Sequence, residues 1–410
     1  MKVIHITASY KPAYIYGGPI QSVAKLCEAL TGLSDKQLAV GGNEIIVNNI
    51  QVLTTTANGK KELDVKTGKP VSMDGVSVTY FKRWTKDHSH FSPQLLWTLR
   101  RKVRRYVQDD KHIEISNSKL IIHIHAWWNL VSVLSCLIAK WYKIPVILSP
   151  RGMLTSYSFG NRNSFSKKLI HKLLGKRLLK YCHIHATSEQ EKQDILKIIT
   201  PKSITIVPNL VNFPLSISSL QSSTDNIFRL IFLSRIEEKK GLELLFEALS
   251  LIEVPWQLII AGMGKEEYVE NLKRKAEKLK LSNKIKWFGL VSKEDKFNLM
   301  ADHDLTVLTS YNENFANVVV ESLSVGTPVL ISKNVGLADY VADKNLGWVT
   351  GLGIEEIRIG IVSAYQDIKK RNEIRTSALK IISHDFNDDA LIKKYVKFYK
   401  DILVQASAKL

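Results

Sequence analysis

Short apolar runs alternate with helical patterns along almost the whole chain. Each run is rich in Val, Ile, Leu and other apolar residues, as expected for buried strands. The candidate strands are "KVIHIT", "IQVLTT", "VSVTYF", "LIIHIH", "PVILS" and "HIHAT" in the first half, and "FRLIFLS", "QLIIAG", "KIKWFG", "DLTVLT" and "TPVLIS" in the second. Near-continuous apolar strands separated by helices are typical of parallel sheets covered on both faces. The pattern therefore predicts an α/β protein with two doubly wound, Rossmann-like domains.

A serine-rich stretch separates the two series of strands. After "SITIVPN" the chain reads "LVNFPLSISSLQSSTDN", which has few charges, and the strand pattern restarts at Phe228. Such a composition is typical of a linker. We therefore predict one domain over residues 1–208, a second over 209–385 and a last helical segment over 386–410. Ligands of open α/β sheets bind outside the carboxyl ends of the strands, so two such domains facing each other would form a cleft there.

The composition is that of a globular, cytoplasmic protein. At 410 residues the chain is longer than one hydrophobic core usually organises. Its 45% hydrophobic and 24% charged content excludes a disordered chain, and no apolar run approaches the roughly 20 residues of a membrane span. The start, "MKVIHITASY", reads as a first strand rather than a signal peptide. The few cysteines lie in apolar contexts, so we expect them to be reduced and buried.

Positive charge is concentrated in the first half of the chain. Residues 1–200 contain 30 Lys and Arg against 13 Asp and Glu, a balance of +17, whereas the remaining residues are close to neutral at +2. A basic region beside a neutral one suggests an anionic partner. The two alternatives are an anionic membrane surface and a nucleic acid.

Two basic segments bear on that choice. In "SPQLLWTLRRKVRRYVQ" one sector of a helical wheel contains six apolar residues: Leu95, Leu96, Leu99, Val103, Tyr106 and Val107. This helix either packs on the core with a solvated basic face or binds a membrane. The segment 161–180 carries basic residues and no acidic one, which favours attraction to anionic headgroups. Neither segment has the aromatic platforms of a nucleic-acid module, so we expect no nucleic acid and a peripheral place at the inner face of the cell membrane.

Glycine-containing turns follow two of the predicted strands. Gly17 and Gly18 precede a proline at a helix start, where backbone N–H groups can meet a ligand, although a simple turn would explain them too. Gly262 and Gly264 form a second such turn. The chain contains neither a G-x-G-x-x-G fingerprint nor a P-loop sequence, so an ordinary dinucleotide or P-loop site is excluded.

Two cations flank another strand-to-helix turn. Arg235 comes just after a buried strand, and Lys240 lies at the start of the next helix. Cations placed in this way can converge on one phosphate group. A solvated loop is the alternative, but the position of Arg235 beside an apolar strand favours a site.

Two glutamates, Glu313 and Glu321, frame the apolar run after "DLTVLTS". The helix is expected to begin near Ala316 and to end near Val325. Residues at this spacing differ by about 80° in azimuth and about two turns in height, so the carboxylates cannot form a close acid–base pair. With the open N–H groups of the helix start between them, they suit a ligand that has hydroxyls at both ends and phosphate in the middle. A sugar nucleotide has that form.

These motifs resemble the signature of the retaining GT-B glycosyltransferases of family 4. The family pattern is Arg-x4-Lys-Gly followed by Glu-x7-Glu and Gly-x-Pro-Val, and "RIEEKKG" and "ENFANVVVESLSVGTPVL" match it. The resemblance extends to the paired glycines, "HIHAWWN", "HATSEQE" and "VPN", so it covers nearly the whole chain. "SPRGML" is similar to the subset that builds exopolysaccharides and cell-surface glycans.

The resemblance implies a role for each matching position. Arg235 and Lys240 would neutralise the diphosphate leaving group, with help from the N–H groups of the paired glycines. Glu313 would hold the donor sugar, and Glu321 would accept hydrogen bonds from the ribose. The remaining donor contacts, largely through the backbone, are expected from Asn209, Gly262, Gly264, Phe288, Gly289, Asn314, Phe315 and Ala316. The last helix would pack back on the first domain.

One position departs from the family pattern. Many members have a histidine after the strand equivalent to "PVILSP", whereas this chain has Arg151 followed by Gly152. Arginine cannot act as a general base near neutral pH, but it can bind an oxyanion or a carboxylate. Either a sugar-contacting role moves to His125 or the acceptor is acidic.

Two further patterns are candidate metal sites. His123 and His125, like His183 and His185, share a strand face, so a zinc site from both pairs is geometrically possible. The "DHD" sequence at 302–304 mimics the D-x-D motif that binds manganese in the other large glycosyltransferase fold, but here an acidic turn explains it. We expect no metal and no cofactor, with the nucleotide diphosphate sugar as co-substrate.

The motifs and the resemblance favour retaining sugar transfer to a glycan or lipid-linked acceptor. Two alternative functions remain. One is a nucleotide-sugar epimerase or a phosphorylase on the same fold. The other is a basic protein that binds nucleic acid or membrane without catalysis. The motifs of the second domain argue against the latter.

Overall fold

The computed structural model describes residues 1–35, 49–86, 89–109, 120–155, 158, 175–214, 226–292 and 295–407. The chain divides into two compact units. Unit 1 contains Met1–Leu210 and Asp388–Leu410, and unit 2 contains Val211–Asn387. The predicted boundary lies two residues before the observed one, and the last helical segment belongs with the N-terminal unit. The two doubly wound α/β domains expected from the sequence are confirmed.

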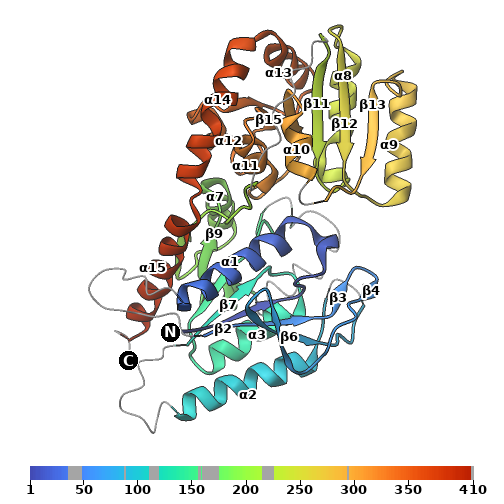
Figure 1. Cartoon of the computed structure of the whole chain (residues 1–410). Helices are drawn as coiled ribbons and strands as arrows, with labels where there is room; N and C mark the ends of the chain where they lie inside the picture. Colours follow the sequence, from blue (N-terminus) through green and yellow to red (C-terminus); the bar gives the residue numbers. More distant parts are fainter. Residues whose placement is uncertain are drawn as a thin grey trace. The chain divides into compact units, whose positions relative to one another are not determined.

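Unit 1 is built on an eight-stranded sheet of order β10-β9-β8-β7-β1-β2-β6-β5 (Figure 1). All neighbours are parallel except the antiparallel β5–β6 pair. The strands are β1 (Lys2–Thr7), β2 (Asn49–Thr55), β5 (Pro70–Met73), β6 (Val76–Phe81), β7 (Leu120–His125), β8 (Val146–Ser149), β9 (His183–Ala186) and β10 (Ser203–Ile206). A two-stranded hairpin adds β3 (Ala57–Asn58) and β4 (Lys61–Glu62).

Helices cover this sheet, and two of them begin at a side-chain cap. The helices are η1 (Tyr14–Tyr16), α1 (Gly18–Asp35), α2 (Pro93–Asp109), α3 (Leu130–Trp141), α6 (Lys176–Leu179), α7 (Glu189–Ile198) and α15 (Asp388–Ser407). The Asn129 side chain caps α3 by accepting a hydrogen bond from the Ser132 N–H, and Ser188 caps α7 in the same way.

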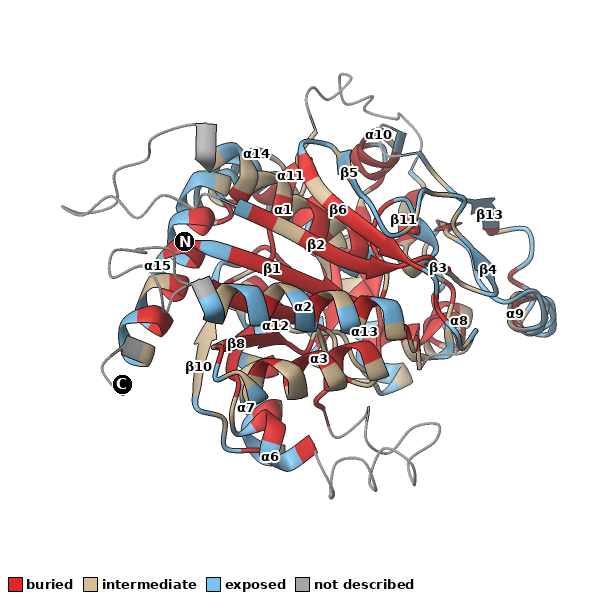
Figure 2. Cartoon of the chain, turned by 90° about the horizontal axis from the view of Figure 1, so that it is seen from below, coloured by how far each residue is buried: buried red, intermediate tan, exposed pale blue. Residues whose placement is uncertain are grey.

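The basic helix α2 packs its apolar sector into the core of unit 1. Leu95, Leu99 and Val103 are fully buried, and the neighbouring apolar side chains are partly buried against the same core. Its arginines at 100, 101, 104 and 105 are exposed, so red and pale blue alternate along this helix in Figure 2. The apolar sector is therefore not available to enter a bilayer, and the interpretation as a core-packed helix with a solvated basic face is right. The other basic segment, 161–180, lies mostly outside the described residues.

Unit 2 is built on a six-stranded parallel sheet of order β13-β12-β11-β14-β15-β16. The strands are β11 (Phe228–Leu233), β12 (Trp256–Ala261), β13 (Ile285–Gly289), β14 (Leu305–Leu308), β15 (Val329–Ser332) and β16 (Gly347–Thr350). The helices are η3 (Glu238–Lys240), α8 (Leu242–Ser250), α9 (Glu266–Lys278), α10 (Asp295–Ala301), α11 (Asn317–Ser324), α12 (Ala338–Asp343), α13 (Ile354–Gln366) and α14 (Ile368–Asp385).

Both sheets reverse their strand order beside their first strand. In unit 1 this strand, β1, lies between β2 and β7, and in unit 2 the equivalent β11 lies between β12 and β14. Because successive crossovers are right-handed, the helices before and after the reversal cover opposite faces. Ligands of open parallel sheets bind at this switch point, beyond the carboxyl ends of the strands. Side chains that follow β1 and β7, or β11 and β14, are therefore placed for function.

The structure also bears on two expectations from composition, one about the cysteines and one about membrane spans. Cys27, Cys136 and Cys182 are all free and buried, as expected. Within the part of the chain that the structure describes, no helix combines the length and hydropathy needed to cross a bilayer.

Candidate active site

Charged side chains gather at the switch point of unit 2. Arg235 follows β11, and its Nη1 lies 2.7 Å from Oε1 of Glu237. Lys240, at the end of η3, is buried and forms an ion pair with Glu313, which follows β14. Since β11 and β14 are neighbours in the sheet, these groups lie together beyond the carboxyl ends of its central strands, which we call the charged edge of unit 2. The sequence predicted Arg235, Lys240 and Glu313 but not Glu237, and the structure adds that Lys240 pairs with Glu313 and Arg235 with Glu237.

Electrostatics link the three predicted residues. Burial lowers the pKa of Lys240, and the carboxylate of Glu313 opposes that effect. Burial pushes the pKa of Glu313 upward, but Lys240, Lys239 and Arg235 together outweigh it, and the pKa is held below its usual range. Arg235 is close enough to contribute to both shifts. The carboxylate of Glu313 is therefore ionised at neutral pH, beside the cations that could meet a charged ligand.

Glu313 does not cap the helix that follows it. Its backbone joins a small bridge, in which its N–H donates to the carbonyl of Asn334 and its carbonyl accepts from the N–H of Gly336. Helix α11 instead begins after Ala316, which has a left-handed backbone (φ 66°) and provides no side-chain cap. A left-handed alanine stores strain, as residues at functional sites often do. The capping explanation for Glu313 is thus excluded.

The predicted glycines of the strand ends hold the Arg235 turn in place. A Cβ on Gly262 would lie 1.8 Å from the carbonyl oxygen of Ser234, and one on Gly264 would lie 2.4 Å from that of Ile236. Only glycine allows the two backbones to approach so closely. The prediction gave these glycines a direct contact with the donor, whereas their observed contacts are with the turn that carries Arg235.

Glu321 lies on α11, the helix that follows Glu313, and is bound by Lys296, a residue that the sequence analysis did not identify. It is buried on α11, and its Oε1 accepts a hydrogen bond of 2.6 Å from Nζ of Lys296 on α10. The two residues are 25 positions apart, so no local pattern connects them. Lys296 orients the carboxylate and leaves Oε2 for other partners.

Phe315 is one of the residues near α11 that were predicted to contact the donor through the backbone, and its side chain has a structural role. Phe315 is buried and packs edge-on against Phe386, with ring centroids 6.0 Å apart. Its side chain therefore belongs to the core of unit 2, and only its backbone and those of Asn314 and Ala316 remain for a ligand.

Apolar side chains are exposed at the ends of β12 and β13. Met263, Phe288 and Leu290 are 62%, 55% and 78% exposed. The two turns are joined because the N–H of Gly262 donates to the carbonyl of Gly289 at 2.7 Å. Exposed apolar side chains therefore lie in the region where the sequence placed Phe288 and Gly289.

The paired glycines of unit 1 differ from one another. The N–H of Gly17 donates to the carbonyl of Tyr14 and closes the η1 turn. It is therefore not available to a phosphate, which corrects the prediction for this residue. Gly18 is the first residue of α1 and is exposed.

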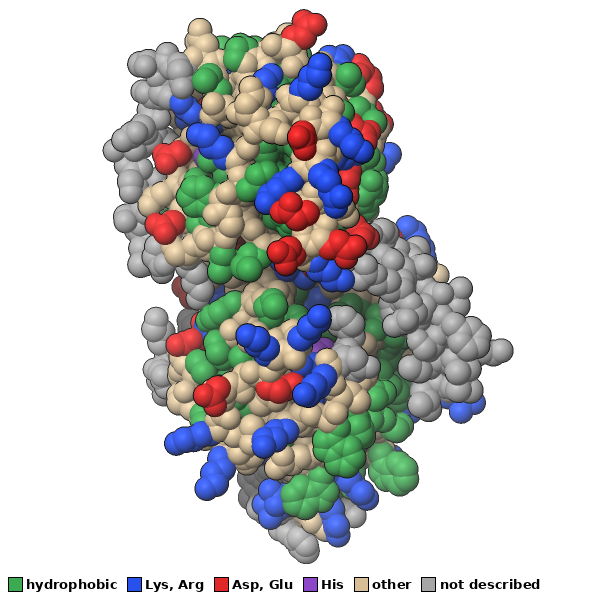
Figure 3. Space-filling model, turned by 90° about the vertical axis from the view of Figure 1, so that its right-hand side faces the viewer, with side chains coloured by type: hydrophobic (Ala, Val, Ile, Leu, Met, Phe, Trp, Pro, Cys, Tyr) green, Lys and Arg blue, Asp and Glu red, His purple; other side chains and the backbone are tan. Residues whose placement is uncertain are grey.

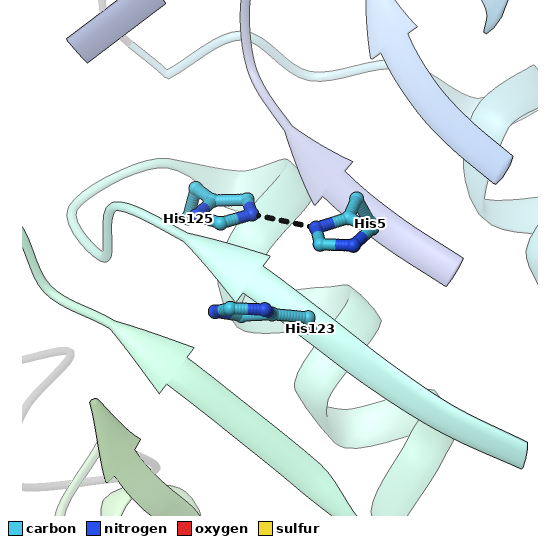
Figure 4. Close-up of side chains that lie close together, drawn as sticks. All are labelled: His5, His123 and His125. Carbon is cyan, nitrogen blue, oxygen red and sulfur yellow. Dashed lines mark hydrogen bonds between the residues drawn. The ribbon is translucent and has the colours of Figure 1, made fainter. Parts of the chain in front are cut away.

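A cluster of buried histidines occupies the switch point of unit 1. His5 of β1 lies beside His123 and His125 of β7, and His5 is hydrogen-bonded to His125 (Figure 4). Sequence reasoning identified the two histidines of β7 but missed His5, because its place depends on the register between β1 and β7. His125 was expected at a sugar, but it is almost fully buried and engaged within this cluster.

A series of hydrogen bonds through the cluster fixes which ring nitrogens of His185 and His123 carry a proton. Burial lowers the pKa of His185 to about 3 and that of His123 well below its usual range, so both rings are neutral. His185 Nε2 lies 2.8 Å from the carbonyl of Val207 and must donate to it, so its Nδ1 accepts from Ser149. Ser149 in turn accepts from Nε2 of His123.

The chain of donors ends on the last helix. Nδ1 of His123 accepts from the hydroxyl of Tyr399 at 2.8 Å, and the hydroxyl of Tyr395 lies 3.1 Å from Nε2 of His185. Both tyrosines belong to α15, so this helix completes the polar interior of unit 1.

A second chain runs from Arg151 through two histidines. Its Nη2 lies 3.4 Å from Nδ1 of His125 and can only donate, so Nε2 of the neutral ring donates to Nδ1 of His5. The other terminal nitrogen of Arg151, Nη1, donates to Oδ1 of Asn209. Asn209, expected at the base of the nucleotide, therefore lies in unit 1 and orients Arg151.

The same cluster is a conceivable metal site. One ligand nitrogen from each of His5, His123 and His125 lies within 4.8 Å of the others. The two nitrogens of His123 already bond Tyr399 and Ser149, and the guanidinium of Arg151 lies beside His125. A metal cation would have to break these bonds next to a positive charge, so the residues do not fit one.

The "DHD" sequence has a structural role. Asp304 accepts a hydrogen bond from the backbone N–H of Arg229 and pairs with Arg375 at 3.2 Å. This is consistent with an acidic turn before β14.

Two family models match the chain over most of its length. The model described as "Glycosyl transferases group 1" matches residues 218–380, and "Glycosyltransferase Family 4" matches residues 48–213. The chain belongs to the group 1 glycosyltransferases. The first match contains Arg235, Lys240, Glu313 and Glu321, so the charged edge of unit 2 belongs to the glycosyltransferase region of the chain.

Comparisons with individual proteins agree with this family. A glycosyltransferase of Methanocaldococcus jannaschii is 26% identical over 59% of this chain and 65% of its own length. The lipopolysaccharide core biosynthesis glycosyltransferase LpsE of Rhizobium meliloti is 29% identical over 35% of this chain and 40% of its own. These alignments thus span less than two thirds of the relatives.

The crystal structure of Anabaena HepE in complex with UDP covers 98% of this chain and 100% of its own, with a TM-score of 0.69 and 18% identity. At that identity the likeness concerns the fold. It is the GT-B fold, with two Rossmann-like domains, as the motifs implied.

Proposed function

We propose that this group 1 glycosyltransferase moves a sugar from a nucleotide diphosphate sugar to a glycan or lipid-linked acceptor, with retention of the anomeric configuration. The observation that carries the proposal is the charged edge of unit 2, where Arg235 and Lys240 lie beside Glu313 at the sheet's switch point. A departing diphosphate needs fixed cations, and a sugar needs an acceptor for its hydroxyls. HepE, solved with UDP, supports a nucleotide donor.

The donor would be held by unit 2 in three parts. Arg235 and Lys240 would bind the diphosphate, which exchanges their protein carboxylate partners for phosphate oxygens. Glu321, oriented by Lys296, would accept hydrogen bonds from the ribose hydroxyls. The exposed apolar surface of Met263, Phe288 and Leu290 would support the base.

Catalysis would come from orientation and from charge stabilisation. As negative charge grows on the leaving diphosphate, the two cations stabilise it more strongly than in the ground state, which lowers the barrier. In a retaining reaction without an enzyme nucleophile, the departing phosphate would assist attack on the same face of the sugar. Because protein cations supply the positive charge, the reaction would need no metal.

Unit 1 would present the acceptor, in the biosynthesis of a cell-envelope polysaccharide. The relative LpsE, whose name refers to lipopolysaccharide core biosynthesis, supports this class. Exposed arginines of α2, with Arg101 stacked 4.6 Å from the ring centre of the 59% exposed Trp97, would attract an anionic membrane at its inner face. Figure 3 shows Lys and Arg side chains beside exposed hydrophobic ones on one face of the molecule. Flotation with vesicles that contain or lack anionic lipid tests this association.

A donor panel tests the proposal. The purified chain is mixed with nucleotide diphosphate sugars, each with and without candidate acceptors, and release of the nucleoside diphosphate is measured. We expect acceptor-dependent release from one donor, with the product anomer identified by NMR. Release that needs no acceptor would indicate a hydrolase, and conversion of the donor without an acceptor and without net release of the nucleoside diphosphate would indicate an epimerase.

Arg235→Ala then tests the assigned chemistry. Its kcat should fall far more than its donor affinity, because the leaving-group charge is fully developed only in the transition state. Arg274→Ala, which removes an exposed arginine from α9 of the same unit, is the matched control and should keep normal turnover. Near-normal turnover of Arg235→Ala would refute the role.

A further inference from the structure

Arg151 carries a positive charge that no carboxylate of the described residues contacts. It follows β8, and its terminal nitrogens donate to two neutral partners, Oδ1 of Asn209 at 3.2 Å and Nδ1 of His125 at 3.4 Å. Its Nε is buried without a hydrogen-bond partner in the described part of the chain. A guanidinium taken out of water without a counter-ion is strongly unfavourable. This charge therefore needs an anion that the described chain does not supply.

The carboxylate that interacts with Arg151 over a longer range is committed elsewhere. Glu191 is buried at the start of α7, and its two oxygens accept hydrogen bonds from the N–H of Gly152, the N–H of Thr187 and the hydroxyl of Thr187, at 2.8–2.9 Å. With three donors on it, the carboxylate is fixed in the cap of its own helix. It moderates the charge of Arg151 but does not pair with it.

The other groups around Arg151 hold the guanidinium without neutralising it. His125 and His5 are buried, neutral rings. His125 donates its one N–H to Nδ1 of His5, so His5 carries its own proton on Nε2. The result is a fixed fork of N–H donors at the carboxyl edge of the unit 1 sheet, beside the switch point between β1 and β7. This edge is where open parallel sheets bind their ligands. Arg151 as a whole is only partly buried, so part of its side chain is exposed.

We propose that Arg151 is the centre of an oxyanion-binding site in unit 1 and that the sugar substrate bound there carries a carboxylate or a phosphate group. The planar fork of arginine matches two oxygens of one oxyanion, which distinguishes it from a lysine. Asn209 and His125 hold the fork in one orientation, so it is preorganised for such a ligand. The inference rests on the proposed transfer reaction, in which unit 1 receives the acceptor, and it makes that acceptor acidic.

Binding of simple sugars in the absence of a donor tests the site directly. Methyl β-glucuronide and glucose 6-phosphate, with methyl β-glucoside as the neutral reference, are titrated against the full chain by ligand-observed NMR. We expect at least one acidic sugar to bind tenfold more tightly than the glucoside. Preference for the glucuronide identifies a uronic acid as the source of the oxyanion, and preference for the phosphate identifies a sugar phosphate. Equal binding of all three overturns the proposal without any variant.

Variants then assign the preference to one side chain. Arg151→Gln should abolish it, and Arg151→Lys should restore part of it, because a point charge replaces the fork. Arg104→Gln, which removes an exposed arginine of α2 in the same unit, should keep the full preference. An unchanged preference in Arg151→Gln, with a native circular dichroism spectrum, overturns the assignment.

The outcome is separate from that of the donor panel. A chain that releases no nucleoside diphosphate refutes the transfer reaction, while the sugar titration still reports on the oxyanion site. A chain that transfers equally well to neutral and acidic acceptors, in wild type and in Arg151→Gln, keeps the proposed function and overturns this inference.

Discussion

The two units share a topology, but the side chains at the carboxyl ends of their strands differ in kind: they are charged in unit 2 and mostly neutral in unit 1. In unit 2 the switch point is lined by ion pairs, Lys240–Glu313 and Arg235–Glu237, with Lys296–Glu321 on the helices beside it. In unit 1 the same place holds neutral imidazoles joined by directed hydrogen bonds. Paired charges can be exchanged for those of a ligand, whereas a neutral network fixes geometry. The difference teaches that unit 2 is built to meet a strongly charged ligand and unit 1 to hold one guanidinium in place.

The largest expected effect comes from breaking the buried ion pair of unit 2. Lys240→Ala should lower kcat/KM by about 10²–10³-fold, since one preorganised charge at a leaving group is worth that much. It should also destabilise unit 2 by about 3–5 kcal/mol, because Glu313, whose side chain is only 13% exposed, would lose its partner. Donor kinetics and urea unfolding measure the two effects.

A double variant separates these two causes. Lys240→Met with Glu313→Gln removes both charges, so stability should recover while activity stays low. Lys273→Ala, an exposed lysine of α9, is the control for the loss of a lysine in unit 2. Recovery of activity together with stability would show that the pair is structural only.

Acid sharpens the comparison from the side of unit 1. In the unfolded chain a histidine binds a proton near pH 6.5, whereas burial, assisted by repulsion from Arg151, keeps the pKa of His5 at about 3 in the folded chain, and burial likewise holds that of His185 at about 3. The unfolded state therefore binds more protons between these values, and stability falls as the pH drops below 6.5. At pH 5 each such histidine should have cost about 2 kcal/mol. Hydrogen exchange of each unit in urea, at pH 7 and at pH 5, measures the loss.

Unit 2 serves as the internal control for this experiment. Among its described residues the one buried histidine is His303, whose pKa is also lowered by burial, whereas the described part of unit 1 has six buried histidines. The pKa of Glu313 is held below its usual range by nearby cations, so this carboxylate stays ionised throughout the pH window. Equal loss of protection in both units at pH 5 would contradict the neutral-network interpretation.

The smallest expected effect concerns the lysine that orients Glu321. Lys296→Met should raise the KM for the donor by about tenfold, the value of roughly one hydrogen bond to a charged group, with little change in kcat. Removal of the 2′-hydroxyl of the bound nucleotide should then matter less in the variant than in wild type, because the carboxylate is no longer aimed at the ribose. Isothermal titration with the nucleoside diphosphate and its 2′-deoxy analogue measures this.

Lys278→Met, an exposed lysine of α9, is the matched control and should bind both nucleotides as wild type does. Lys296→Arg keeps a cation at the site and should restore part of the discrimination. A full effect of the 2′-hydroxyl in Lys296→Met would mean that Glu321 needs no help from its partner.

Much of this fold was predictable because its central strands are continuous apolar runs. β16 was missed since its four residues are too few for a clear period, and β5 since it is an antiparallel edge strand without a buried residue. The predicted start of α2 was close to the observed one because Pro93 marks it.

The site was predictable where its chemistry is local in sequence. Arg235 and Lys240 lie on one turn, so spacing alone could pair them. Lys296 with Glu321 and His5 with His125 depend on which elements are neighbours in space, and no period in the sequence records that. Gly262 was assigned to the ligand because a glycine needed for backbone packing and one needed for a ligand look the same in sequence.

The position of α15 has a consequence for how the protein is made. This helix supplies Tyr395 and Tyr399 to the interior of unit 1, yet it is synthesised after the whole of unit 2. Until it arrives, His123 lacks its hydroxyl donor and the apolar residues Leu391 and Ile402 have left their places in the core empty. The first part of unit 1 therefore leaves the ribosome before unit 2, but unit 1 is completed only when α15 has been made. Unit 2 can reach its native state before unit 1 does.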